Sequence, residues 1–410
     1  MAAHDPYASL RNADFRRLIA SYFAATIARE AQIVVVGWQA FEMTHDPLTL
    51  GLVGLAEALP LIAVALYAGH VADRAPRRTI ALAGTFAMFL SAIAFLALTM
   101  SGAISHGRVW PIYLIIFFSG IARSFTRPAV TALSAEVIER ELYANAVTWR
   151  SSTWQFAAVV GPALGGLIYG FAGAKAAYAC VSVAMALSVI MLWTISHRTA
   201  PLIPDEGEIP IGESVRLGLR FLFAQPVILA AMSLDLFSVL FGGAIALLPV
   251  FAKLLQAGPQ GLGVLRAAPA IGSLVTGVIV AHRPPMKRAG AALFASVAVF
   301  GVMMILFALS RSFLVSFLVL TVSGMADNVS VIIRSTLIQT MTPQHMLGRI
   351  SAVNQIFIGA SNEIGAFESG VAARIMGVVP SVIFGGAMTL FVVAVTAWRS
   401  PALRKMTTVS

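Results

Sequence analysis

The stretch "GHVADRAPRR", residues 69–78, places one acid and three arginines directly after an apolar run, 48–68, in which Glu57 is the only charge. The whole chain has the same contrast, because 59% of its 410 residues are hydrophobic and only 11% are charged. A soluble domain of this size could not bury that much apolar surface. The composition therefore predicts a membrane protein, with this charged stretch as a short loop between two membrane helices.

Twelve apolar runs in the sequence are long enough to cross a membrane as helices. The hydrocarbon core of a bilayer is about 30 Å thick and takes about 20 helical residues to cross. The predicted spans are 16–43, 48–72, 79–101, 110–135, 142–171, 174–197, 226–252, 259–281, 289–310, 312–341, 346–376 and 380–398. These runs predict an all-α membrane protein with twelve transmembrane helices.

Basic residues gather on alternate loops between these spans, as in 74–78, 283–288 and 399–405. By the positive-inside rule, we expect both termini and the loop 69–78 on the cytoplasmic side. The net charge of +10 then reflects membrane topology, and no nucleic-acid partner is expected. The first span is too long for a cleavable signal peptide, and no small-residue cleavage site precedes the second span.

A polar segment, 196–226, divides the predicted spans into six and six. The domains expected from it are an N-terminal bundle, 1–198, a linker, 199–225, and a C-terminal bundle, 226–410. The linker stretch "GESVRLGLRFLF" alternates Arg216 and Arg220 with apolar residues, which predicts an amphipathic helix along the inner membrane surface. Sparse matches between the halves, such as Gly161 with Gly365, favour a parallel repeat, which is typical of transporters.

Ionisable residues inside the bilayer are distributed with a period of three helices. Each costs about 2.5 kcal/mol or more at a helix centre unless it meets water or a partner. The third, sixth, ninth and twelfth spans have no charge in their cores. The first, fourth, seventh and tenth contain Arg29, Glu30, Arg123, Arg127, Asp235, Asp327 and Arg334, and the remaining spans contain Glu57, Arg150, Arg266, Glu363, Glu368 and Arg374. This period predicts four three-helix units around a central polar cavity.

The opening stretch resembles the signature loop of the major facilitator superfamily, which reads G-x-x-x-D-R-x-G-R-R. The matching residues are Gly69, Asp73, Arg74, Arg77 and Arg78, and Pro76 replaces the second glycine. The resemblance implies two six-helix bundles with pseudo-two-fold symmetry, and a cytoplasmic latch at this loop. Asp73 would cap the helix that begins near Arg349, as a negative charge at a positive helix end. The alternative is that the loop only sets the topology.

A second motif, "GPALGG", lies in the span 142–171 and comprises Gly161, Pro162, Gly165 and Gly166. It resembles the glycine–proline pattern of drug:proton antiporters. Small residues let this helix approach a neighbour closely, and the proline weakens its backbone ladder. Close packing without any exporter role is the alternative interpretation.

A third resemblance covers residues 323–370, together with "LRNADFRRL" before the first span and "LLPVFA" in the seventh. It is to the major facilitator branch that includes the bacterial enterobactin exporter and related drug and siderophore efflux proteins. The resemblance implies a proton-coupled exporter of the bacterial cytoplasmic (inner) membrane that moves an amphipathic small molecule. The first span departs from the pattern at Ala28-Arg29-Glu30, where relatives often place a glycine and one polar residue.

An enzyme is not expected, because no lysine follows a glycine as in a phosphate-binding P-loop, and the seven histidines form no recognisable metal-ligand pattern. We expect no cofactor and no metal. The expected partners are a small-molecule substrate, protons and membrane lipids, and the protein is expected to be a monomer. The alternatives are a lipid or lysolipid flippase, an uptake symporter, and a receptor or scaffold that does not transport.

Buried carboxylates are the candidates for proton coupling, and the three predicted carriers are Glu30, Asp235 and Asp327. Glu30 is favoured, because Arg29 points roughly 100° away around the helix and need not neutralise it. Cationic and aromatic side chains are candidates for holding an acidic, aromatic substrate. The residues predicted to line the substrate cavity are Arg29, Trp38, Glu57, Arg123, Trp154, Arg266 and Glu363.

Overall fold

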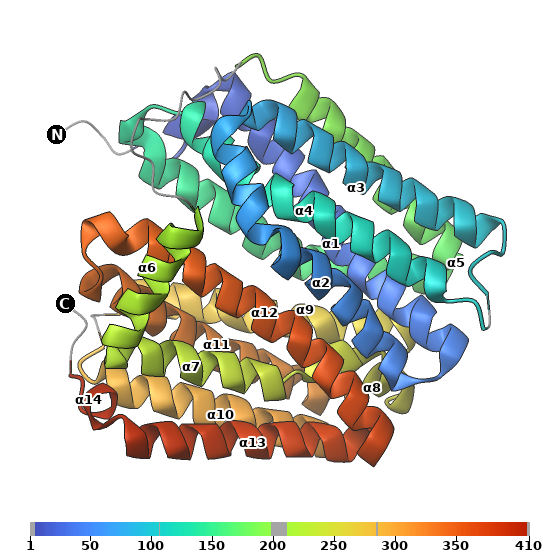
Figure 1. Ribbon diagram of the computed structural model, residues 1–410. Helices are drawn as coiled ribbons and strands as arrows, with labels where there is room; N and C mark the ends of the chain where they lie inside the picture. Colours follow the sequence, from blue (N-terminus) through green and yellow to red (C-terminus); the bar gives the residue numbers. More distant parts are fainter. Residues whose placement is uncertain (1–4, 106, 198–210, 284–285, 408–410) are drawn as a thin grey trace. The chain divides into compact units, whose positions relative to one another are not determined.

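The computed structural model describes residues 5–105, 107–197, 211–283 and 286–407, and these residues form helices and no β-strand (Figure 1). The long helices of the first half are α1 (Ala13–Thr44), α2 (Pro47–Arg74), α3 (Arg77–Met100), α4 (Trp110–Glu136) and α5 (Tyr143–Trp193). Those of the second half are α6 (Ile211–Ala224), α7 (Pro226–Phe241), α8 (Leu248–Leu254), α9 (Gly258–Ala281), α10 (Ala289–Leu309), α11 (Phe313–Met341), α12 (Gln344–Met376) and α13 (Val378–Arg399). Short helices η1 (Ala8–Arg11), η2 (Arg140–Leu142), η3 (Ala244–Leu247) and α14 (Pro401–Arg404) complete the described part.

The described part of the chain contains nine helical segments that are long and apolar enough to cross a membrane. The prediction of an all-helical membrane protein is thereby confirmed, whereas the count of twelve spans stays a prediction. Proline at the first helical position begins α2 and α7, where its missing N–H has no helical partner to lose. Gly377, with a φ of 92°, separates α12 from α13 and ends α12 in a backbone conformation that glycine adopts without strain.

Two predicted spans, 142–171 and 174–197, lie in the single element α5. The backbone of α5 leaves helical geometry at Gly173, with φ 78° and ψ 177°, so the break falls between the predicted spans. The predicted span 226–252 corresponds to one apolar segment, Pro226–Leu254, that is long enough to cross a membrane, but it is not the single helix that the sequence predicted. It consists of α7, η3 and α8, because the chain leaves the helix at Gly242-Gly243, where two adjacent glycines weaken a helix.

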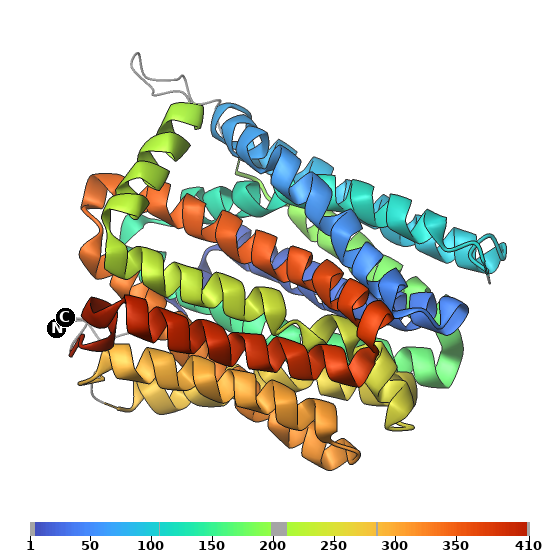
Figure 2. The ribbon, with the colours of Figure 1, turned by 60° about the horizontal axis from the view of Figure 1, so that its bottom comes forward.

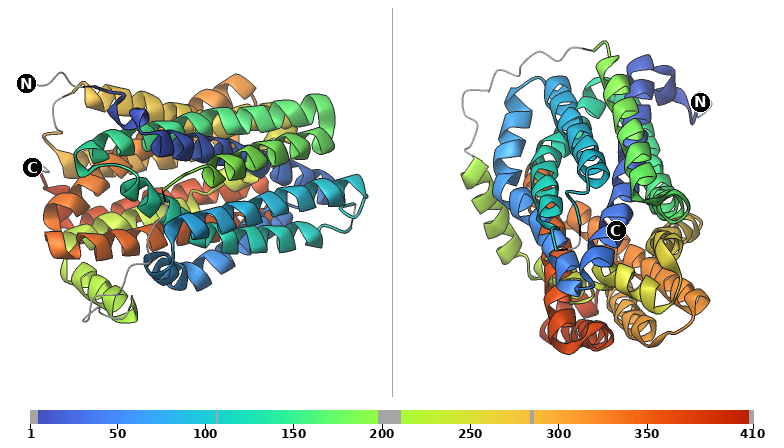
Figure 3. Two further views of the ribbon diagram at one scale, coloured as in Figure 1. Left: turned by 90° about the horizontal axis from the view of Figure 1, so that it is seen from above. Right: turned by 90° about the vertical axis from the view of Figure 1, so that its right-hand side faces the viewer.

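The described residues group into two compact units. One unit comprises those of Met1–Thr44 and Leu59–Glu208, and the other those of His45–Ala58 and Ile209–Ser410. In the first unit, α1 packs along α5, and α3 packs against α4 and α5 (Figure 3). A buried cluster at one end of this unit joins Phe15 and Leu18 of α1 to Leu133 of α4 and Leu192 of α5.

In the second unit, α11 packs against α9 and α10, and α7 packs against α12 and α13. Figure 2 shows α10 and α13 side by side along their length. The first turns of α2 belong to this unit and approach α12 closely, since a Cβ built on Gly370 would lie 2.7 Å from the Cα of Gly51. Asp46, just before α2, pairs with Arg374 of α12 at 3.2 Å.

The predicted linker helix is present as α6, and it is amphipathic. Leu222 is fully buried against α7 and α12, whereas Arg216 and Arg220 are exposed. A Cβ on Gly218 would meet Val353 and Arg349 of α12 at 3.3 to 3.5 Å, so glycine allows α6 to lie close to that helix. The apolar face of α6 therefore covers α12, and the position of this helix along a membrane surface stays a prediction.

Candidate functional site: two ionisable clusters and a network at the helix ends

A buried ion pair joins α7 to α11 in the second unit. Arg334 of α11 pairs through Nη1 with Oδ1 of Asp235 of α7, and the two residues are only 3% and 8% exposed. Removing two charges from water costs several kcal/mol for each ion, and the pair persists because each charge compensates the other. Breaking such a pair leaves one charge buried without compensation, so the two residues depend on each other.

A second acid, Asp327, lies beside this ion pair. Asp327, Ser330 and Arg334 follow one another at steps of three and four residues, which places them on one face of α11. Asp327 lies within electrostatic range of both Asp235 and Arg334. The residues around a shared pocket of about 230 Å³ are Asp235, Ser238, Val239, Val297, Phe300, Asp327 and Ser330. The lining brings two carboxyl groups and two hydroxyl groups to one small space, which suits water or a proton relay.

The sequence analysis identified both acids of this cluster as proton carriers, and the structure brings them together. It did not identify Ser238, Ser330 or Arg334 as site residues. The hydroxyl oxygen of Ser330 is buried and has no hydrogen-bond partner among the described residues, and Ser238 donates to the carbonyl of Leu234. The spacing of polar residues on α11 was the available signal, because residues three, four and seven apart share a helix face.

Arg29 and Glu30, adjacent on α1, form an ion pair with each other. Nη1 of Arg29 lies 2.8 Å from Oε1 of Glu30. The expectation that the two need not neutralise each other, because their Cα–Cβ bonds point about 100° apart, was therefore wrong. The long arginine stem is flexible enough to carry its head around the helix to its neighbour. Glu30 thus has a fixed cationic partner.

Arg29 also belongs to a cationic cluster in the first unit. Arg127 of α4 lies within electrostatic range of Arg29, of Arg123 one turn away on α4, and of Arg150 on α5. Tyr22 of α1 lies within range of Arg29, Arg127 and Arg150. Like charges at positions i and i+4, such as Arg123 and Arg127, destabilise an isolated helix by about 0.2–0.5 kcal/mol. Only Arg29 and Arg123 were predicted cavity residues, and the structure adds the other two.

The remaining predicted cavity residues are divided between the two units. Trp38 of α1 and Trp154 of α5 belong to the first unit, and Trp154 is 45% exposed. Glu57 of α2, Arg266 of α9 and Glu363 of α12 belong to the second unit. The structure therefore assigns the seven predicted cavity residues to two separate groups, and their role in one cavity stays a prediction.

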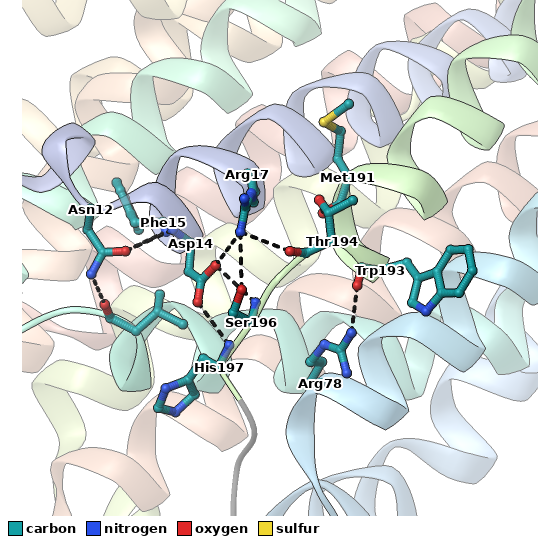
Figure 4. Close-up of polar contacts among 11 residues, drawn as sticks. Asn12, Asp14, Phe15, Arg17, Arg78, Met191, Trp193, Thr194, Ser196 and His197 are labelled. Carbon is teal, nitrogen blue, oxygen red and sulfur yellow. Dashed lines mark hydrogen bonds and ion pairs between the residues drawn. The ribbon is translucent and has the colours of Figure 1, made fainter.

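Arg77 and Arg78 of the signature loop interact with residues of their own unit. Arg77 pairs with Glu136 at the end of α4, and Nη2 of Arg78 donates to the carbonyl of Trp193 at the end of α5, 2.6 Å away (Figure 4). The predicted roles of Gly69, Asp73 and Arg74 concern side chains that lie outside the described residues. Arg349 of α12 lies 3.5 Å from the sulfur of Met346, and its role in a latch stays a prediction.

Asp14, at the start of α1, organises the same helix ends (Figure 4). Its carboxylate accepts the backbone N–H groups of Ser196 and His197 at 3.0 and 2.9 Å. Arg17 donates to Asp14 and to the carbonyl of Thr194, each at 2.9 Å. Asp14 and Glu136 were missed in the sequence, because acids at helix ends do not stand out from ordinary loop charges. Together with the loop arginines they tie the ends of α1, α3, α4 and α5.

The "GPALGG" motif of α5 faces α1, as expected for a close helix contact. A Cβ on Gly161 would lie 2.7 Å from the Cβ of Glu30, and one on Gly165 would lie 2.6 Å from the carbonyl oxygen of Ala31. Both glycines, Pro162 and Gly166 are buried. The close approach is thus confirmed, whereas an antiporter role of the motif stays a prediction.

The fold is similar to that of solved membrane transporters. A POT family transporter in complex with 5-aminolevulinic acid has a TM-score of 0.72 at 10% identity, covering 95% of this chain and 96% of the other. The nucleoside transporter NupG has a TM-score of 0.72 at 13% identity, covering 94% of this chain and 99% of the other. The apolar helices and the family match define the class of the protein as a multi-pass membrane transporter of the major facilitator type, and its fold is similar to that of these solved transporters.

The sequence places the chain more narrowly within that class. Residues 4–409 match the profile of the family described as transmembrane secretion effector, and the chain belongs to that family. The enterobactin exporter EntS of Escherichia coli O1:K1 is 26% identical over 345 residues, covering 83% of this chain and 80% of the relative. That of Shigella flexneri is 24% identical over 346 residues, with the same coverage.

Proposed function

We propose that the protein is a secondary active exporter of the bacterial cytoplasmic membrane, which couples export of an amphipathic small molecule to proton entry. In this proposal the twelve predicted spans form two six-helix bundles with pseudo-two-fold symmetry, both termini are cytoplasmic, and transport proceeds by alternating access. The relatives described as enterobactin exporters support export as the direction of transport and enterobactin as a model for the cargo. In this proposal the cargo is a siderophore or a drug. The protein works as a monomer among membrane lipids and has no enzymatic activity.

The observation that carries the proton coupling is the charge of the α7–α11 cluster. Asp235 and Asp327 contribute two negative charges and Arg334 one positive charge, so the cluster has a formal charge of −1. An uncompensated charge in a site shielded from water is unfavourable, and binding of one proton removes it. Asp327 is the better carrier of the two acids, because Asp235 is already held by Arg334. A proton that enters and leaves at Asp327 would therefore change the charge of the cluster between −1 and zero.

Glu30 is the alternative carrier. Its carboxylate already forms an ion pair with Arg29, and its Cβ lies against Gly161 at a closely packed helix contact. We therefore rank Asp327 before Glu30.

Purified protein in proteoliposomes tests this assignment, with enterobactin and ethidium as two chemically different probes. We expect wild-type protein to accumulate at least one probe against its gradient when a pH gradient is imposed, and to stop when an ionophore collapses the gradient. Asp327→Asn should lose this driven accumulation but retain exchange of labelled probe across the membrane without a gradient. Glu30→Gln is the matched comparison and should retain pH dependence.

Driven accumulation by Asp327→Asn with the pH dependence of the wild type would exclude Asp327 as the carrier. If Glu30→Gln, and not Asp327→Asn, lost driven accumulation, the carrier would lie on α1. Accumulation in the opposite direction would identify an uptake symporter, and movement of a fluorescent lysolipid in place of either probe would identify a flippase.

A further inference from the structure

We infer that the four arginines of the first unit bind the acidic part of the substrate, which is an aromatic or otherwise flat molecule with two or more negative charges. The inference rests on the proposed transport function and specifies its substrate class. The residues concerned are Arg29 of α1, Arg123 and Arg127 of α4, and Arg150 of α5. Arg127 lies within electrostatic range of the other three and of Tyr22. The four arginines come from three helices of one unit, so the cluster is a property of the tertiary fold.

The charge balance of the membrane segments is the first argument. The stretches 18–41, 112–135 and 144–171 contain four arginines and one acid, Glu30. Charged side chains within a membrane are unfavourable, and guanidinium groups close to one another also repel. A multiply charged anion between the arginines would reverse both unfavourable effects.

The chemistry of the guanidinium group is the second argument. Its planar fork donates two parallel hydrogen bonds to a carboxylate, a sulfonate or a pair of neighbouring oxygen atoms, and arginine stays charged at every physiological pH. Four such forks match a ligand with several anionic oxygens. A cationic drug would meet repulsion in the same place, so the cluster also excludes ligands of the wrong charge.

Aromatic side chains beside the cluster supply the third argument. Tyr22 lies within electrostatic range of Arg29, Arg127 and Arg150, and its neighbour Phe23 contacts Phe156 of α5 with ring centroids 5.9 Å apart. Trp154 follows Arg150 by four residues on α5, hence on the same helix face, and is 45% exposed. Flat aromatic faces next to cationic forks suit a ligand that is both aromatic and acidic.

The depth of the cluster agrees with a substrate that arrives from the cytoplasm. At a rise of about 1.5 Å per residue, Arg150 lies roughly 10 Å from the start of α5 and Arg127 roughly 13 Å from the end of α4. In the predicted topology both of these helix ends are cytoplasmic. Arg29 lies near the middle of α1, so the cationic surface extends from the cytoplasmic half towards the middle of the membrane.

A set of pyrene derivatives tests the inference, because they share one ring system and differ in charge. The probes are aminomethylpyrene, pyrenesulfonate and pyrenetetrasulfonate, and their binding to the purified full-length chain is followed by fluorescence. We expect affinity to rise from the cation to the tetraanion, and binding of the tetraanion to weaken with added salt. Arg127→Gln and Arg150→Gln should each weaken tetraanion binding at least tenfold and leave aminomethylpyrene binding unchanged or stronger.

Arg311→Gln, in the exposed loop before α11, is the matched control for net charge and should bind all three probes as the wild type does. Arg127→Lys keeps the positive charge but not the planar guanidinium group. Its affinity for the tetraanion should lie between those of the wild type and Arg127→Gln. Equal affinities for the three probes, or tetraanion binding that both glutamine variants leave unchanged, would overturn the inference. If thermal unfolding shows that one of the two glutamine variants is not folded, the comparison of the other with Arg311→Gln tests the inference.

Failure of the proposed transport function has a different signature. If pH-driven accumulation is absent but affinity still rises from aminomethylpyrene to pyrenetetrasulfonate, proton coupling is contradicted and the anion site is not. If ethidium is transported against its gradient but the three pyrene probes bind with equal affinity, only the anion site is contradicted.

Discussion

Arg334 of α11 and Asp235 of α7 form an ion pair that is almost completely shielded from solvent, with side chains 4% and 10% exposed. The pair connects two helices of the second unit through residues that are 99 positions apart in sequence. Asp327 and Ser330 lie on the same face of α11 and share the pocket with Asp235. A substitution of Asp327 should therefore change the proton chemistry of the cluster and leave the ion pair in place, whereas a substitution of Asp235 breaks the pair.

Asp235→Asn should be strongly destabilising, because it leaves the guanidinium of Arg334 buried without its charge partner. Breaking a buried pair in this way costs about 3–5 kcal/mol, whereas replacing both partners by apolar residues of similar volume is often neutral. The double variant Asp235→Leu/Arg334→Met should therefore unfold at a temperature close to that of the wild type, measured by intrinsic fluorescence in detergent.

Asp327→Asn is the control for this comparison, since it removes a carboxylate and retains the ion pair. We expect it to be at least as stable as the wild type, because it removes the excess negative charge. Strictly additive losses of stability in the double variant would contradict coupling between Asp235 and Arg334.

The ion pair between Arg77 and Glu136 should contribute measurably to the free energy of unfolding. Its two side chains are only 18% and 16% exposed, so solvent screens the pair weakly. A double-mutant cycle of Arg77→Ala and Glu136→Ala should give a coupling energy of about 0.5–3 kcal/mol, as for contacting residues. The same cycle on the exposed pair of Arg11 and Asp5, with side chains 80% and 32% exposed, should give about 0–1 kcal/mol.

Arg77→Lys distinguishes this packing role from a topology signal. Lysine keeps the positive charge that sets membrane orientation but lacks the planar fork of arginine. We expect the lysine variant to insert with the same orientation, measured by labelling of engineered cysteines, and to unfold at a lower temperature than the wild type. Equal unfolding temperatures for wild type and Arg77→Lys would leave the loop as a topology signal only.

The sequence was most informative about the positions of helices and least informative about their rotation. Apolar runs separated by glycine and charge predicted most helix ends, including the break at Gly173 between two adjacent spans. The interruption at Gly242-Gly243 was missed, because glycine is common in membrane helices and a pair of them breaks a helix only in certain surroundings. Length and hydropathy do not distinguish those cases.

The sequence predicted single residues of the candidate site, but it did not predict which residues contact one another. Asp235 and Asp327 stood out because a carboxylate inside a bilayer is unfavourable without a function. The ion pair of Asp235 with Arg334, and the proximity of Asp235 to Asp327, depend on how α7 and α11 are rotated against each other, which no local pattern encodes. The Arg29–Glu30 pair was missed for a smaller-scale reason, because the side-chain torsions of a long arginine decide whether it reaches its neighbour.

The contact of α6 with α12 should depend on Leu222 and not on its neighbour Phe223. Leu222 is fully buried, whereas Phe223 is 67% exposed. Leu222→Ala removes buried methyl groups and leaves a cavity, which costs about 2–5 kcal/mol. Phe223→Ala should change stability by no more than about 0.5 kcal/mol, as for other exposed positions.

Limited proteolysis of the linker checks this prediction, with cleavage in α6 as the measurement. Leu222→Ala should be cleaved faster than the wild type, because α6 separates from α12 more often. Phe223→Ala is the matched control of similar hydrophobicity in the same helix. Equal cleavage rates for the two variants would contradict the packing of α6 by its Leu222 face.

Gly165→Ala should separate α1 from α5 and lower the stability of the first unit. The added Cβ would lie 2.6 Å from the carbonyl oxygen and 2.8 Å from the Cα of Ala31, and these are backbone atoms that cannot rotate away. Overpacking of this kind costs about 1–3 kcal/mol. Gly348→Ala is the matched control on α12, since a Cβ there meets nothing within 4 Å. In a helix, that change should stabilise by about 0.5–1 kcal/mol.

Thermal unfolding of both variants and their rates of probe exchange in proteoliposomes decide what the "GPALGG" motif does. If α1 and α5 move together as one body, Gly165→Ala should lower the unfolding temperature and reduce exchange in proportion to the folded protein lost. If instead α5 must bend or slide against α1, the exchange rate per folded molecule should fall as well, and Pro162→Ala should reproduce that fall without the steric clash. A Gly165→Ala protein as stable as Gly348→Ala would contradict the close contact itself, because the two substitutions differ only in the space that the new methyl group meets.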